Sequence, residues 1–278
     1  RLYTGFGTHY VYLEVGSPSQ AVSVMVDTGS HLTAFPCSPR CEGCGEHTDA
    51  YFSPAASSTF EWLDCGECPA EGSCDEAGCA LEQAYAEGSS WRGRAARDTV
   101  QVGGARLPLS FTCVSRETGL LVSQRANGVV GLSRRALGTS FALCLTPDGG
   151  AFSLGGVDTR RHDEPMRFTA LSGWPYYTVA LADVEIAGRS IGASPSDFAS
   201  GKGAVVDSGT TDTYLPRALA DAFAATWRLA VGAEYDVASG YLRPLPFPDV
   251  VFVFADGLRV RLAPEAYLVR KGARLLPR

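Results

Sequence analysis

One short motif occurs twice in this chain and limits the folds open to it. An apolar run leads into Asp, a small hydroxyl residue and Gly at VMVDTGS (residues 24–30), and again 180 residues later at AVVDSGT (residues 204–210). Since a compact domain commonly holds about 100–150 residues, this interval is close to one domain length. The repeat therefore predicts two similar lobes, each carrying one copy of the motif.

Most of the remaining pattern is typical of β-structure. Short apolar and aromatic runs are separated by Gly, Pro and Ser, which predicts an all-β fold. One clear helix is expected at residues 216–229, where Leu219, Phe223 and Trp227 share a face, and a short helical turn is expected at 141–143. The expected strands cover residues 10–15, 21–26, 99–102, 107–114, 151–154, 176–181, 184–186, 204–206 and 250–254.

The lobes are expected to span residues 1–165 and 166–278, since the polar stretch at 158–164 approaches a boundary. The first lobe also holds an irregular segment, the Cys-rich insert (residues 37–79), in which Gly, Ser, Glu and Cys replace the alternating pattern. The second lobe carries the second Asp motif. The sequence therefore predicts a bilobal all-β protein.

Charge and hydropathy exclude some classes of partner. The chain has 24 Lys and Arg against 30 Asp and Glu, a net charge of -6, and no basic block that could follow a phosphate backbone. We therefore expect no nucleic-acid partner. No apolar stretch reaches the ~18 residues that a membrane span requires, so a membrane anchor of the full-length protein would lie beyond Arg278.

The two motifs predict a pair of carboxyl groups that act on one water molecule. Like charges that close cannot both ionise, so one carboxylate serves as general base while its protonated partner donates to a substrate carbonyl. This is peptide hydrolysis without a metal or another cofactor. The candidate catalytic residues are Asp27 and Asp207, and those expected to support their turns are Thr28, Gly29, Ser30, Ser208, Gly209 and Thr210.

Nine cysteines allow two interpretations. Seven of them lie between Cys37 and Cys79, a density typical of a metal site or of a disulfide-stabilised loop. Two C-x-x-C pairs, at residues 41–44 and 65–68, fit a zinc-ribbon spacing, whereas disulfides would also account for the other cysteines. Spacing alone leaves both alternatives open.

With these motifs in place, the chain resembles the pepsin-like aspartic peptidases. The segment NGVVGL (residues 127–132) is similar to the strand that crosses behind the first catalytic loop of that family, and YAEGS (residues 85–89) resembles its flap. The resemblance implies a bilobal acid-protease fold in a monomer, with Tyr85 and Gly88 on a flap over an extended peptide substrate. It also implies inhibition by pepstatin-like compounds.

The Cys-rich insert narrows the resemblance to nepenthesin-type enzymes and plasmepsin V-like export proteases, and FPC (residues 35–37) favours the second group. That likeness implies a protein of the endoplasmic reticulum or Golgi, or else secreted or vacuolar, that cleaves secretory proteins at an Arg-x-Leu motif. Glu87 would bind the substrate arginine, and peptidomimetics of the Arg-x-Leu motif would inhibit the protease. The implied disulfides join Cys37 to Cys41, Cys44 to Cys113, Cys65 to Cys79 and Cys68 to Cys74.

Four departures from the family pattern bear on function. Arg125 replaces a residue that helps hold the arginine, and Ala86 replaces a free flap cysteine. Ala34 replaces the tryptophan that supports the flap, which leaves Trp91 as a candidate. The second lobe ends early, with Cys144 as an odd cysteine, so it is expected to be incomplete. The alternatives are a broad-specificity nepenthesin-type endopeptidase and a non-catalytic binding protein of the same fold.

Overall fold

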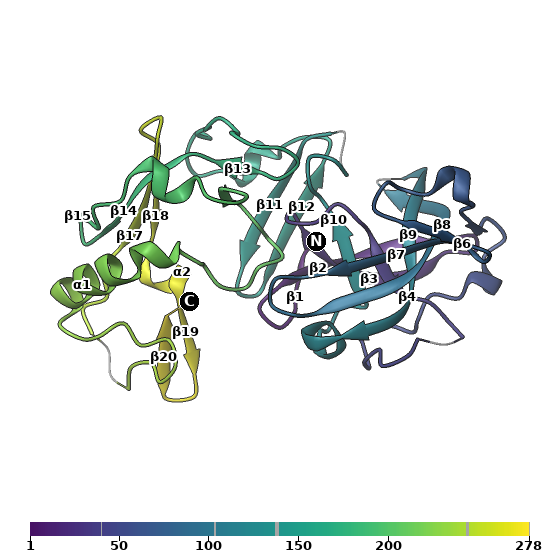
Figure 1. Cartoon of the computed structure of the whole chain (residues 1–278), viewed down its shortest axis with the longest axis horizontal. Helices are drawn as coiled ribbons and strands as arrows, with labels where there is room; N and C mark the ends of the chain where they lie inside the picture. The colour runs from purple at the N-terminus through teal and green to yellow at the C-terminus, as the bar shows by residue number, and fades with distance from the viewer. Residues whose placement is uncertain (40, 103, 137–138, 243–244, 278) are drawn as a thin grey trace. The chain divides into compact units, whose positions relative to one another are not determined.

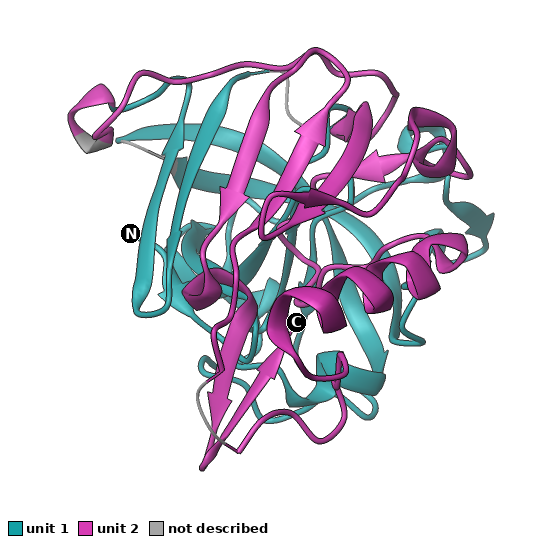
Figure 2. Ribbon diagram, turned by 90° about the vertical axis from the view of Figure 1, so that its left-hand side faces the viewer, with its two compact units in different colours: residues 1–158 teal, residues 159–278 magenta. Residues whose placement is uncertain are grey.

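The structure is a computed structural model that describes residues 1–39, 41–102, 104–136, 139–242 and 245–277 (Figure 1). Contacts within the chain divide it into two compact units, residues 1–158 and 159–278 (Figure 2). This division lies at the start of the polar stretch 158–164, a little before the boundary expected at residue 165. Each unit has its own sheets and its own apolar core.

Unit 1 is built around a ten-stranded sheet of order β1-β2-β3-β10-β4-β9-β8-β7-β6, with β5 paired to β8. Most neighbours are antiparallel, but β10 is parallel to β3, and β4 is parallel to β9. The strands of the sheet are β1 (Tyr3–Thr4), β2 (His9–Val15), β3 (Gln20–Asp27), β4 (Ala34–Pro36), β5 (Glu61–Trp62), β6 (Ser73–Asp75), β7 (Gly78–Ala84), β8 (Ser90–Val102), β9 (Ala105–Thr118) and β10 (Gly128–Gly131). A separate two-stranded sheet holds β11 (Phe141–Thr146) and β12 (Gly149–Leu154). The short 3-10 helices are η1 (Pro54–Ala56), η2 (Cys65–Glu67) and η3 (Gly119–Ser123).

The core of unit 1 holds the strand that carries the first Asp motif. Residues 22–27 of β3 are all buried, which explains why residues 24–26 are apolar in succession instead of alternating with polar residues. Phe35 of β4 stacks on Phe111 of β9 with ring centroids 4.4 Å apart, and Phe52 packs edge-on against both rings. The end of β3 is therefore fixed in well-packed surroundings.

Unit 2 contains a four-stranded sheet of order β15-β14-β17-β18 and two antiparallel two-stranded sheets, β13 with β16 and β19 with β20. Its strands are β13 (Thr178–Val179), β14 (Leu181–Ile186), β15 (Arg189–Ser190), β16 (Ala204–Val205), β17 (Val250–Phe254), β18 (Arg259–Leu262), β19 (Leu268–Lys271) and β20 (Arg274–Pro277). Its helices are η4 (Thr159–Arg161), η5 (Pro195–Phe198), η6 (Arg217–Leu219), α1 (Ala220–Val231) and α2 (Pro264–Tyr267).

The helix expected at 216–229 is confirmed as η6 followed by α1. Pro216 caps its start, and Gly232, in a left-handed conformation at φ 73°, ends it. Leu219 and Trp227 are buried in the core of unit 2, with Phe223 packed beside them. The spacing of these three residues therefore identified the inner face of the helix correctly.

The helical turn expected at 141–143 is wrong, because those residues begin strand β11. Six residues of β11 pair with β12, from Phe141 opposite Leu154 to Thr146 opposite Gly149. A run of three apolar residues does not by itself distinguish helix from strand. Here the hydrogen-bonded pairing with β12 makes the segment a strand.

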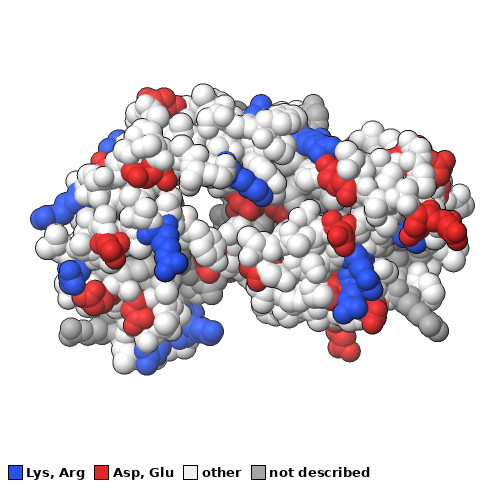
Figure 3. Space-filling view, in the orientation of Figure 1, with Lys and Arg blue, Asp and Glu red and all other residues white. Residues whose placement is uncertain are grey.

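No helix among the described residues is long and apolar enough to cross a membrane. On the face shown in Figure 3, Lys and Arg side chains are interspersed with Asp and Glu rather than gathered in one patch.

Candidate active-site loops

The first carboxylate loop follows β3 and is held from behind. Asp27 is 6% exposed, and the N–H of Gly29 donates to its Oδ1 at 2.8 Å. Strand β10 lies parallel to β3 with Gly131 opposite Asp27, and the N–H of Leu132 donates to the Asp27 carbonyl at 2.8 Å. The crossing strand implied by NGVVGL is therefore present behind this loop.

Close packing against the backbone of the Asp27 loop explains why the crossing strand has glycine at position 131. A Cβ at this position would come within 2.7 Å of the His31 carbonyl carbon and 2.8 Å of the Leu32 nitrogen. Real Cβ atoms do not approach backbone atoms so closely, so any side chain would push β10 away from the loop. One more bond, from the N–H of Ser133 to the Ser30 carbonyl at 3.0 Å, holds the two segments together.

The second carboxylate loop repeats the same turn in unit 2. Asp207 follows β16, and the N–H of Gly209 donates to its Oδ1 at 2.8 Å. The hydroxyl of Thr210 donates to Oδ2 at 2.7 Å. An Asp side chain that accepts from the backbone two residues ahead is a stable local turn. The repeated motif is thus a repeated structure, with one carboxylate held by a backbone N–H in each unit.

The hairpin β7–β8 carries the residues expected on the flap. The N–H of Tyr85 donates to the Ser89 carbonyl at 2.9 Å, and Gly88 at the tip has φ 98°. The indole N–H of Trp91 donates to the Tyr85 hydroxyl at 3.1 Å, which confirms the contact expected between them. Trp91 is buried, so Tyr85 is anchored to the core of the unit.

Glu87 and Arg125 are both exposed and do not pair with each other. The guanidinium of Arg125 instead lies 5.3 Å from the ring centroid of Phe6. Among the described residues, no salt bridge joins Arg125 to Glu87. The flap carboxylate therefore remains open to solvent at the hairpin tip.

The structure uses the eight expected cysteines but contradicts their expected pairing. The expected bonds of Cys37 to Cys41, Cys44 to Cys113, Cys65 to Cys79 and Cys68 to Cys74 are wrong. The bonds found join Cys37 to Cys113, Cys41 to Cys44, Cys65 to Cys74 and Cys68 to Cys79. Since these cysteines bond to one another, the zinc alternative is wrong too, and Cys144 is free within the described chain.

Strand pairing explains the first two bonds. In the parallel pair β4–β9, Phe35 lies opposite Cys113, and the N–H of Cys37 donates to the carbonyl of Val114. Cys37 and Cys113 are consequently neighbours in the core, with 5.2 Å between their Cα atoms. Cys41 and Cys44 are then left to close a small loop on each other.

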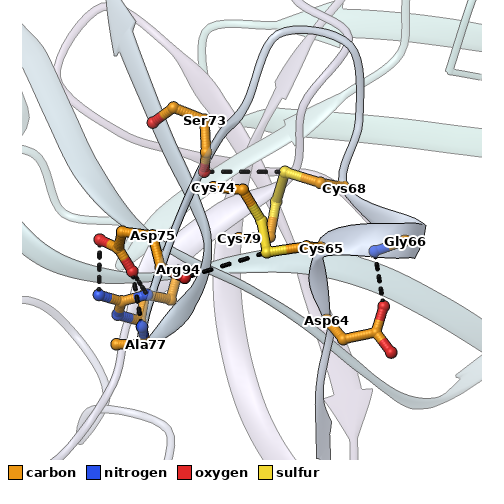
Figure 4. Close-up of a disulfide and its surroundings, with 10 residues drawn as sticks. All are labelled: Asp64, Cys65, Gly66, Cys68, Ser73, Cys74, Asp75, Ala77, Cys79 and Arg94. Carbon is orange, nitrogen blue, oxygen red and sulfur yellow. Dashed lines mark hydrogen bonds and ion pairs between the residues drawn. A yellow bond between two sulfur atoms is a disulfide. The ribbon is translucent and has the colours of Figure 1, made fainter.

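The other two bonds, drawn in Figure 4, are explained by burial. The hairpin β6–β7 places Cys74 opposite Cys79, but Cys79 is buried whereas Cys74 is exposed. Cys68 packs against the cluster around Cys79, and the exposed Cys65 lies with Cys74. One bond therefore joins the two exposed cysteines, and the other joins the two cysteines that pack in the cluster.

A buried pair that joins the Cys-rich insert to β9 was not predicted from the sequence. His47 lies with Nε2 3.3 Å from Oε2 of Glu117 and with Nδ1 3.0 Å from the Gln124 carbonyl oxygen. Two polar residues 70 positions apart give no local signal of contact. Among the described residues, no group of three or more His, Cys, Asp or Glu side chains could hold a metal ion.

Comparison with known proteins identifies the family. A family model described as "Xylanase inhibitor N-terminal" matches residues 9–156, and "Eukaryotic aspartyl protease" matches residues 138–274. The chain belongs to the pepsin-like aspartic protease family.

Several named relatives fit this membership. Aspartic protease 5 of Toxoplasma gondii is 28% identical over 76% of this chain and 29% of its own length. Nepenthesin-1 of Nepenthes gracilis is 29% identical over 77% of this chain and 54% of its own. Plasmepsin V of Plasmodium falciparum is 28% identical over 55% of this chain and 30% of its own. The chain thus spans only about a third to a half of the length of these relatives.

Proposed function

We propose that this protein is an aspartic endopeptidase in which Asp27 and Asp207 activate one water molecule. The observation that carries the proposal is the matched pair of turns, each holding one Asp carboxylate by the N–H of the glycine two residues ahead. In family members that keep both aspartates, this arrangement serves catalysis. Both aspartates are present here.

The chemistry needs one proton between the two carboxyl groups. The ionised carboxylate removes a proton from water as the water oxygen attacks the peptide carbonyl carbon, and the protonated carboxyl donates to the carbonyl oxygen. The resulting gem-diol collapses when its C–N bond breaks and a proton passes to the nitrogen. Neither a metal nor another cofactor takes part in these steps.

The flap hairpin supports binding of an extended peptide. A peptide strand can add to an exposed hairpin edge by main-chain hydrogen bonds, with side-chain pockets setting specificity. Tyr85 is held by Trp91 on this hairpin, and Gly88 gives its tip a turn that other residues adopt poorly.

For substrate class, we infer a preference for peptides with an Arg-x-Leu motif. The exposed Glu87 carboxylate can accept two charge-assisted hydrogen bonds from a guanidinium. Because Arg125 lies against Phe6, it leaves the Glu87 carboxylate available to a substrate arginine. Four disulfides support a location in the secretory pathway, where thiols become oxidised.

The test uses the full-length protein and a peptide library that contains Arg-x-Leu and scrambled sequences. We expect cleavage after Leu that is lost in Asp27→Ala and in Asp207→Ala. Glu87→Gln should lower kcat/KM for arginine peptides by about tenfold and leave arginine-free peptides unchanged. Cleavage that depends on both aspartates but not on arginine would indicate a broad endopeptidase instead.

A second candidate is a non-catalytic binding protein, which the match to "Xylanase inhibitor N-terminal" favours. Binding of a pepstatin-like inhibitor distinguishes the two, because its hydroxyl replaces the attacked water between two competent carboxyl groups. A folded full-length protein that neither cleaves peptides nor binds this inhibitor would support the binding-protein function.

A further inference from the structure

We propose that the buried pair of His47 and Glu117 is a proton-dependent link that positions the flap residue Tyr85 from the Cys-rich insert. This inference rests on the proposed function, since Tyr85 acts only if the hairpin covers a substrate. His47 and Glu117 do not touch the substrate in this proposal and are positioning residues.

The geometry of the pair requires a shared proton. The His47 side chain is fully buried and that of Glu117 is 4% exposed. Because the Gln124 carbonyl oxygen can only accept, Nδ1 of His47 carries a hydrogen. The contact from Nε2 to the Glu117 carboxyl then needs one further proton, held by either partner. Without it, two acceptors would face each other away from water, which is costly.

The two hydrogen bonds of the His47 ring favour its charged form. Burial acts to lower the pKa of His47, but its bonds to Glu117 and to the Gln124 carbonyl outweigh burial and raise the pKa. The Tyr51 ring centroid lies 6.2 Å from that of His47, and Glu46 precedes His47 in the same loop. Burial, followed by the negative charges of Glu117 and Glu46, raises the pKa of Tyr51, so it stays neutral. The groups named here beside the imidazole are therefore acidic or neutral.

The pair is connected to the flap through the sheet. Glu117 on β9 lies directly opposite Trp91 on β8, so the two buried side chains share one face of the sheet. Trp91 in turn donates to the Tyr85 hydroxyl. A shift of the Glu117 side chain thus changes the packing of the residue that holds Tyr85.

Backbone bonds on both sides of His47 make the insert part of this path. The N–H of Glu42 donates to the Ser115 carbonyl at 2.7 Å, and the N–H of Thr48 donates to the Arg125 carbonyl at 2.9 Å. The bonded Cys41 and Cys44 pack against the cluster that contains Trp91. The insert is consequently attached to the two segments that flank η3.

The direction of the pH effect follows from the raised pKa of His47. Stabilisation by the pair is fully present below about pH 6.5, where an unfolded histidine is also protonated, and it is lost as the pH rises through the higher pKa of folded His47. Positioning of Tyr85 should therefore weaken towards alkaline pH.

The first experiment compares His47→Gln with a matched control, His9→Gln, in the full-length protein. His9 lies in the same unit and its Nε2 also contacts a carbonyl oxygen, that of Thr146 at 2.8 Å. We expect His47→Gln to lower Tm by about 5–10 °C near pH 6 and by less than half as much near pH 8.5. His9→Gln should show a small loss at both pH values. Equal pH dependence in the two variants would overturn the proposal.

The second experiment reads the flap directly. Subtracting the tryptophan emission of Trp91→Phe from that of the wild type isolates the emission of Trp91. We expect this emission to change with pH in the wild type and to stay constant in a His47→Gln background. The double variant His47→Gln/Glu117→Gln keeps neutral hydrogen bonds, so it should regain much of the lost Tm without regaining the titration. A Trp91 titration unchanged by His47→Gln would contradict the link.

Peptide cleavage separates this inference from the proposed function. If the protein cleaves, His47→Gln should raise KM more than it lowers kcat, with the difference greatest at acidic pH. If wild-type protein cleaves nothing, the proposed function fails. The Tm and emission results would still decide whether His47 and Glu117 form the link.

Discussion

The two carboxylate loops share one turn but differ in what supports them. Asp27 ends a strand with six consecutive buried residues, and β10 runs parallel behind it. Asp207 follows the two-residue strand β16, which pairs only with β13 among the described residues of unit 2. Val206, just before Asp207, is 56% exposed. The motif therefore specifies the turn, whereas the support of the Asp27 loop comes from strand β10, about 100 residues away in sequence.

The prediction with the largest expected effect tests whether the two aspartates contribute unequally to catalysis because their loops are supported unequally. In the full-length protein, Asp27→Asn and Asp207→Asn should each lower kcat by about 100- to 10,000-fold, because each removes one half of the proposed acid–base pair. Steady-state peptide cleavage measures both. A variant that retained wild-type kcat would show that its loop lies outside the catalytic site.

The next effect concerns the support of the Asp27 loop. Gly131→Ala should lower the free energy of unfolding by about 2–4 kcal/mol, since its Cβ has no room beside the backbone of His31 and Leu32. Urea unfolding measures this loss.

Gly156→Ala is the matched control for Gly131→Ala. A Cβ at Gly156 meets no atom within 4 Å, and the residue does not need a positive φ. We expect a change within about 0.5 kcal/mol. Equal losses in the two variants would mean that β10 does not support the loop.

The smallest effect compares the hydroxyls three residues after each aspartate. Thr210 donates to Asp207, so Thr210→Val should lower kcat about fivefold, or about 1 kcal/mol. The buried Ser30 hydroxyl has no hydrogen-bond partner within the described chain, so Ser30→Ala should change kcat less than twofold. A reversed order would contradict the difference between the loops.

Local patterns predicted the features that depend on few residues. The two Asp turns need only a strand end, a hydroxyl residue and Gly, and the face of α1 needs only the spacing of Leu219, Phe223 and Trp227. Strand β17 matches its expected range because VVFVF is bounded by charged and turn residues. Each of these signals lies within a dozen residues.

Features that depend on distant pairing could not be predicted. The bond of Cys37 to Cys113 follows from the register of β4 against β9, which the local sequence does not specify. Strand β8 includes RGRAARD, whose charged residues conceal its pairing with β7 and β9. The contact of His47 with Glu117 likewise needs the fold to bring them together.

The most direct test of the central proposal, that both loops serve one site, is calorimetric binding of a pepstatin-like inhibitor to the full-length protein. We expect one inhibitor per chain in the wild type, and affinity at least about tenfold weaker in both Asp27→Asn and Asp207→Asn. Binding that is lost in only one of the two variants, or wild-type protein that is folded and does not bind, would contradict a shared site.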